Sequence, residues 1–279
     1  MKAKMVVVAA ALVVSLGLSG SCWAAGETVP PGDQKSEPRG DIIRAEMPGI
    51  DMSNANMEGK KIEWSDLRNG HFKGANFQKA TIERVQFHGG DFSDADFSGA
   101  TLKWVKFVGA TMPNANFTGA KLERVDFSEL DEDEKDSDKP GAKEAKPTVL
   151  NGAKFTGANI QWGEFRGANA AEADFANAAL ERVYFSPFGH EDKENEAEAA
   201  SGTAGQTGRP GAVLRSAKFS GATLNWCEFI KTDCTGADFS GAVMNRVDFG
   251  EATLVDVNMR VKSMENVGTE GASMNGMKR

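Results

Sequence analysis

The chain has 279 residues, of which 40% are hydrophobic and 26% are charged, and its formal net charge at pH 7 is -8. This acidic balance argues against a nucleic-acid-binding protein, because such proteins hold phosphate groups with clustered lysine and arginine. Cys227, Cys234 and the three histidines show no metal-type spacing, so we expect no zinc site and no cofactor.

Residues 1–24 have the pattern of an export signal. Lys2 and Lys4 precede an apolar run over residues 5–18, and small residues follow it. The run is shorter than the roughly 20 residues that a membrane-spanning helix needs. We therefore expect cleavage after Ala24 and a periplasmic or secreted mature protein without a transmembrane segment.

A lipid anchor on Cys22 is a less favoured alternative, because Ser19 stands where a lipoprotein signal normally has leucine. The next segment, residues 25–39, has three prolines and no apolar periodicity. We expect it to form a flexible tether.

From Gly40 to Gly276 the sequence repeats every five residues. Units such as ANFQK, ADFSG and ANFTG place a small residue first, a polar residue second and a large apolar residue third. Sixteen of the 17 phenylalanines occupy that third position. A period of five fits neither a helix nor a long strand, so the chain must turn a corner every five residues. We expect residues 277–279 to be a short tail.

This pattern resembles the pentapeptide-repeat family, whose motif is a small residue, Asp or Asn, Leu or Phe, a polar residue and Gly. The resemblance implies an all-β fold, a right-handed quadrilateral β-helix with four units per coil and the first and third residues of each unit inward. Because a unit buries only two side chains, coils must stack to be stable. Similarity is strongest at twenty residues, which predicts about ten coils beginning at Gly40, Lys60, Ala80, Ala100, Ala120, Ala158, Ala178, Ala222, Ala242 and Lys262.

Two insertions interrupt the repeat, at residues 130–147 and 188–211, and the frame resumes after each. Both leave after the second face of a coil and return at its third, so they should emerge from the same edge. Their charged, Gly-, Ala- and Pro-rich composition predicts mobile loops. The acidic run 131–138 could bind Ca²⁺, but it lacks the glycine and terminal glutamate of an EF-hand loop. We therefore expect its carboxylates to be solvated.

The fifth residue of the first face alternates between arginine and tryptophan. An arginine between two indoles gains a cation–π contact of about 0.5–1 kcal/mol at an exposed site, whereas stacked arginines alone would repel one another. Neighbours in such a column lie about 4.8 Å apart, which allows this contact. The positions, here named the Trp/Arg column, are Arg44, Trp64, Arg84, Trp104, Arg124, Trp162, Arg182, Trp226 and Arg246, with Asn266 following.

Two interpretations of the column stay open. It stiffens the surface of the rod, or it binds a partner, because exposed aromatic rows often mark interaction sites. Sugar rings and the carboxylates of cell-wall polymers are the ligands considered. The adjacent outward column on the second face would belong to the same surface, and it comprises Asp66, Gln86, Lys106, Asp126, Glu164, Tyr184, Glu228 and Asp248.

The sequence therefore predicts an exported, non-enzymatic scaffold or binding module that engages an envelope protein or glycan. No nucleophile with a base, metal set or phosphate loop is recognisable. The family resemblance supplies an alternative, a DNA-mimicking gyrase-binding protein of the quinolone-resistance type, which the export signal and the Trp/Arg column disfavour. Homodimerisation and a disulfide between Cys227 and Cys234 stay open.

Overall fold

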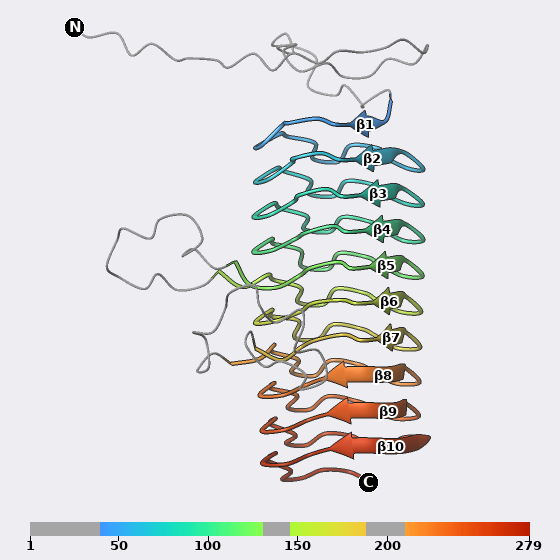
Figure 1. Cartoon of the computed structure of the whole chain (residues 1–279), viewed down its shortest axis with the longest axis vertical. Coiled ribbons are helices and arrows are strands. Elements are labelled where there is room, and N and C mark those ends of the chain that lie inside the picture. The colour runs from blue at the N-terminus through green and yellow to red at the C-terminus, as the bar shows by residue number, and fades with distance from the viewer. Residues whose placement is uncertain (1–39, 131–145, 188–209) are drawn as a thin grey trace, which may run out of the picture.

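The computed structural model describes residues 40–130, 146–187 and 210–279. The expected export signal (1–24) and tether (25–39) lie outside these residues, and so does nearly all of the expected loops (130–147 and 188–211). The described residues form a β-solenoid without a helix, in which the chain winds in ten stacked coils along one long axis (Figure 1). The predicted all-β, β-helical fold is thereby confirmed.

Each coil contributes one strand to a parallel sheet of ten strands, and the strand order along the axis is the order in the chain (Figure 1). The last three strands are longer, because they continue around the corner into the second face. The strands are β1 (Ile42–Ile43), β2 (Lys61–Glu63), β3 (Thr81–Glu83), β4 (Thr101–Lys103), β5 (Lys121–Glu123), β6 (Asn159–Gln161), β7 (Ala179–Glu181), β8 (Thr223–Glu228), β9 (Val243–Asp248) and β10 (Ser263–Gly268).

The strand register follows the twenty-residue period, with two exceptions. Lys121 of β5 pairs with Asn159 of β6, and Ala179 of β7 pairs with Thr223 of β8. At both steps the extra residues are accommodated between the second and third faces. The same positions face inward before and after each step, so the inward columns continue through both.

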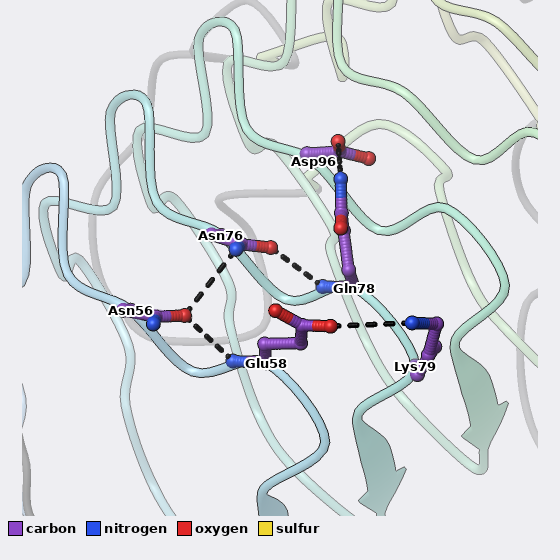
Figure 2. Close-up of polar contacts among 6 residues, drawn as sticks. All are labelled: Asn56, Glu58, Asn76, Gln78, Lys79 and Asp96. Carbon is purple, nitrogen blue, oxygen red and sulfur yellow. Dashed lines mark hydrogen bonds and ion pairs between the residues drawn. The ribbon is translucent and has the colours of Figure 1, made fainter.

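The second residue of each unit shapes the corner that follows it. Oδ1 of Asn56 accepts a hydrogen bond from the backbone N–H of Glu58 at 3.1 Å, and Oδ1 of Asn76 does the same for Gln78 at 3.0 Å. Such Asx turns favour a tight bend. Nδ2 of Asn76 also donates to Asn56 at 3.3 Å, and Nε2 of Gln78 donates to Asp96 at 2.6 Å (Figure 2). The Asn and Asp residues of the repeat thus hold turns and link coils.

The core consists of columns of like side chains stacked along the axis. Within the two main phenylalanine columns, ring centroids of successive coils are 4.6–5.3 Å apart and nearly parallel, while rings of different columns meet edge to face. Each buried ring stabilises the fold by roughly 1.5–3 kcal/mol before the loss of conformational entropy. The columns are Phe87, Phe107, Phe127, Phe165, Phe185, Phe229 and Phe249 on the second face, and Phe77, Phe97, Phe117, Phe155, Phe175, Phe219 and Phe239 on the fourth.

Candidate functional site: the Trp/Arg column

The Trp/Arg column follows the corner between the first and second faces, just after β1 to β7 and within β8 and β9. All nine members, and Asn266 after them, have φ between 53° and 57°, in the left-handed region. This conformation costs residues other than glycine roughly 1–2 kcal/mol. The fifth residues of other faces also adopt a positive φ, but there glycine is frequent, as at Gly59, Gly74 and Gly99. Large side chains are thus retained where glycine would be less strained.

Sequence analysis missed this backbone constraint, although the sequence carries a sign of it. Glycine and asparagine recur at the fifth position of the other faces, and these are the residues that best tolerate a positive φ. The alternation of two large side chains therefore stands out against the conformational preference of the position. The column's side chains, rather than its backbone, must account for the choice of residue.

The structure brings most of the column into cation–π contact, as the spacing predicted. The first contact is between Arg84 and Trp64, with 4.2 Å from guanidinium carbon to ring centroid. Among the described residues, no such contact involves Arg44, and none joins Arg84 to Trp104.

A continuous ladder begins at Trp104 and ends at Arg246. Two arginines in it lie between two indoles each, so each of these guanidinium groups has an indole on either side along the axis. The guanidinium carbon of Arg124 lies 4.4 Å from the ring centroid of Trp104 and 5.3 Å from that of Trp162. That of Arg182 lies 4.6 Å from Trp162 and 5.3 Å from Trp226, and that of Arg246 lies 4.0 Å from Trp226.

The exposure of the indoles decreases along the column. Trp64 and Trp104, each in contact with one arginine, are 51% and 47% exposed. Trp162, in contact with two arginines, is 36% exposed, and Trp226 is partly buried. The arginines therefore cover indole faces, and the covered faces point along the axis of the rod rather than toward solvent.

The outward column on the second face lies beside the Trp/Arg column, and its carboxylates have local partners. Oδ2 of Asp66 lies 2.6 Å from Nη2 of Arg68, and hydrogen bonds from Arg68 lower the pKa of Asp66. Oε2 of Glu164 lies 3.4 Å from Nε of Arg166, while burial and the charge of Asp126 raise the pKa of Glu164. These contacts tie Asp66 and Glu164 each to an arginine two residues along its own coil.

Arg166 also fixes the start of the second insertion. Its Nη1 donates to the carbonyl oxygen of Pro187 at 3.1 Å and to Oγ of Ser186 at 3.3 Å, and its guanidinium lies over the ring of Tyr184 at 4.8 Å. Ser186 in turn donates to the carboxylate of Glu228 at 2.6 Å. Sequence analysis did not single out Arg166, because it stands at a position that is polar in most units.

The first insertion is closed at its base by an antiparallel pair, in which Leu130 and Lys146 exchange backbone hydrogen bonds of 2.7 and 3.1 Å. Below it, Oγ1 of Thr148 donates to the carbonyl oxygen of Ser128 at 2.6 Å and accepts from the backbone N–H of Gly109 at 2.8 Å. Thr148 was recognisable in the sequence, because it occupies a small inward position that is alanine in most units.

Cys227 and Cys234 are free and buried, so the open question of their disulfide is answered for this structure. Burial raises the pKa of each thiol to about 12, which keeps both protonated and unreactive at neutral pH. Within residues 40–130, 146–187 and 210–279, no group of three or more His, Cys, Asp or Glu side chains is arranged to hold a metal ion. The same part of the chain has no helix that could cross a membrane.

Two family models match the sequence. The model described as "Pentapeptide repeat region" matches residues 60–136, and the model described as "Pentapeptide repeats (8 copies)" matches residues 148–186, 211–246 and 224–260. Together these matches cover more than half of the chain. No curated protein sequence matches it.

Solved structures of similar architecture include HetL, a pentapeptide repeat protein involved in heterocyst differentiation regulation from the cyanobacterium Nostoc sp. strain PCC 7120. It is 19% identical, with 85% of this chain and 88% of HetL covered and a TM-score of 0.36. Full-length QnrB1, a plasmid-mediated fluoroquinolone resistance protein, is 16% identical, with 86% and 93% covered and a TM-score of 0.36. A pentapeptide repeat protein from the Arabidopsis thaliana thylakoid lumen is 18% identical, with 60% and 83% covered and a TM-score of 0.20.

Proposed function

The chain belongs to the pentapeptide-repeat family, and from this premise we propose that it is an exported, non-enzymatic scaffold that binds an envelope protein or glycan. The proposed binding surface is the Trp/Arg column with the adjacent column of the second face. Export is proposed from residues 1–24, whose two lysines, apolar run and small residues are typical of a secretory signal.

The observation that carries the proposal is the column itself. Nine arginines and tryptophans occupy corner positions with φ above 50°, where glycine would be less strained. They form one line along the rod, and three of the four indoles are at least 36% exposed. A row of exposed indoles alternating with cations along one edge of the rod has the properties of an interaction site.

A non-enzymatic role is supported by the state of the reactive groups. The thiols are buried and protonated, and Asp66 and Glu164 of the adjacent column are paired with arginines. Acid–base or nucleophilic catalysis needs such groups poised toward a substrate.

DNA mimicry directed at gyrase is the second candidate, and the net charge of -8 is the observation in its favour. A DNA mimic requires an extended surface of negative charge. The line of five arginines along the rod interrupts that surface, and export would separate the protein from gyrase. The first proposal therefore has the stronger support.

The test is capture of envelope material by the purified mature chain. We expect replacement of Trp64, Trp104, Trp162 and Trp226 by alanine to abolish capture of a protein or peptidoglycan component. The matched control replaces Lys79, Glu172 and Ser216, corner residues of positive φ on other faces, by alanine and should capture normally. Melting temperatures measured in parallel identify unfolded variants.

Undiminished capture by a folded Trp→Ala variant would overturn the proposed surface. The export part has its own test, the intact mass of the protein recovered from fractionated cells. Cleavage near Ala24 and recovery outside the cytoplasm are expected, whereas an uncleaved cytoplasmic protein that binds gyrase would favour the second candidate.

A further inference from the structure

The Trp/Arg column presents hydrogen-bond donors and no side-chain acceptors. A guanidinium carries five N–H donors and an indole carries one, and neither group accepts a hydrogen bond. The column is therefore complementary to a ligand that is rich in acceptors. Because five of its nine members are cations, that ligand should also be negatively charged.

The ladder restricts the positions of its guanidinium groups. Arg124 and Arg182 each lie between two indoles, and Arg246 lies against one at 4.0 Å. Contacts on the faces of a planar guanidinium leave its N–H groups free at the edge. Such preorganisation reduces the entropy lost when an anion binds.

These three arginines have no carboxylate partner among the residues that the structure describes. By contrast, Arg68 binds Asp66 and Arg215 binds Asp233, each with 2.6 Å between nitrogen and oxygen. Within the column, Arg84 has Glu83 at 3.7 Å. Glu123, which precedes Arg124 in the chain, is paired with Lys103 at 3.0 Å, and Glu181, which precedes Arg182, accepts a hydrogen bond from Nε2 of Gln161 at 3.4 Å. Their positive charge is therefore available.

We infer that Arg124, Arg182 and Arg246 are three receptors for the carboxylates of a linear anionic polysaccharide that lies along the rod. This inference rests on the proposed function and names the ligand of the same surface. Each guanidinium binds one carboxylate through two parallel N–H donors, the geometry that arginine favours. The indoles act as supports for the arginines, because at Trp162 contact with two guanidinium groups takes the faces that a sugar ring would need.

The spacing of the receptors selects the polymer. The three arginines stand two coils apart, a separation of about 9.6 Å at the usual distance between strands. A polysaccharide with one uronic acid in each disaccharide carries its carboxylates at a comparable interval. An extended acidic peptide repeats the same face every two residues, about 6.7 Å, and does not match.

The experiment measures binding of the full chain to a hyaluronan oligosaccharide, which has one carboxylate in each disaccharide, by calorimetry and tryptophan fluorescence. The control ligand is the same oligosaccharide with its carboxylates reduced to alcohols. We expect the carboxylated chain to bind and the reduced chain to bind at least tenfold more weakly, since charge-assisted hydrogen bonds are lost.

Two triple variants test the receptors. The first variant combines Arg124→Gln, Arg182→Gln and Arg246→Gln. It should bind the oligosaccharide about tenfold or more weakly. Lysine at the same positions keeps the charge but loses the bidentate geometry, and it should also weaken binding. The matched control removes the same charge outside the column, by Arg215→Gln, Arg260→Gln and Arg279→Gln. It should change the affinity for the oligosaccharide by less than about twofold.

Equal binding of carboxylated and reduced oligosaccharide, or no binding of either, overturns the inference. The inference is also overturned if a helical peptide with glutamate at every seventh position binds more tightly than the carboxylated oligosaccharide. That result would assign the column to an acidic protein. If envelope capture still depends on the column in these cases, the proposed function stands and only its ligand is wrong. If capture does not depend on the column, the proposed function fails as well.

Discussion

At the scale of single residues, the Trp/Arg column combines an unfavourable backbone with favourable side-chain contacts. Each member has a positive φ, which costs free energy, and each cation–π contact returns about 0.5–1 kcal/mol at an exposed site. The two effects are similar in size. The contacts therefore make the large side chains tolerable at the corner, and neither effect alone decides the stability of a coil.

The ladder predicts unequal effects of equal substitutions. Trp162→Ala removes contacts with two arginines, whereas Trp64→Ala removes a contact with one. We expect Trp162→Ala to lower the free energy of unfolding by about 1–2 kcal/mol, and Trp64→Ala by roughly half as much. Urea denaturation of the two variants measures this difference. Equal losses would show that the ladder does not act through its arginines.

The pair of Asp66 and Arg68 predicts a pH dependence. Hydrogen bonds from Arg68 hold the pKa of Asp66 below its usual value. The folded state therefore binds the proton less readily than the unfolded state, so the pair stabilises the fold above the usual pKa of aspartate. This stability is lost as the pH falls through the lowered pKa.

Asp66→Asn keeps an acceptor for the turn but removes the charge. We expect the variant to be less stable than the wild type at pH 7 and to lose less stability on acidification. The urea midpoints of the wild type and of the variant, measured at neutral and acidic pH, give the stability that each protein loses on acidification. Equal losses would contradict the role assigned to Asp66.

At the scale of elements, the inward columns were predictable because each position repeats in every coil. A five-residue period with phenylalanine in the third position leaves one arrangement that buries the rings, and the register of β5 with β6 and of β7 with β8 retains it across both insertions. The contacts that Arg166 and Thr148 make at the bases of the insertions were not predictable, although Thr148 itself stands out at a position that is alanine in most units. They occur once each, so no periodicity indicates them, and they depend on which coils lie next to one another.

Ala170 is the smallest side chain in its inward column. Ala170 is fully buried at a third position of the third face, where the coils before and after it have Leu150 and Leu214. Backbone hydrogen bonds of 2.7 Å from Leu150 and 2.8 Å from Ala170 keep the coil spacing normal there. Leucine should therefore fit, and we expect Ala170→Leu to raise the free energy of unfolding by about 1–2 kcal/mol. Chemical denaturation tests this, and a lower midpoint would mean that the neighbouring rings already fill the space.

At the scale of the whole molecule, the described coils form a rod roughly 45 Å long, given the usual spacing of strands. Each coil contacts only its neighbours, so stability is a sum of coil and interface contributions. The acidic and basic residues of the described coils nearly balance, so most of the chain's net negative charge lies outside them, and the rod carries one line of arginines along its length. A long anionic ligand would be attracted along this line.

The buried thiols report on how coils open. Cys227 and Cys234 lie in the coil of β8, where burial shields both thiols from reagents and raises their pKa values to about 12. We expect a thiol reagent to label them slowly, with the same urea dependence as the loss of β-structure measured by circular dichroism. Rapid labelling without urea would instead show that this end of the rod opens locally.

The central claim is that the Trp/Arg column is the contact surface, and arginine footprinting tests it most directly. The full chain is treated with an arginine-specific reagent with and without a native envelope fraction, and modification is quantified by mass spectrometry. The account predicts that Arg124, Arg182 and Arg246 become protected, while Arg215 and Arg260 react equally in both samples. Unchanged modification of the three column arginines, in a sample where the envelope component is bound, would contradict it.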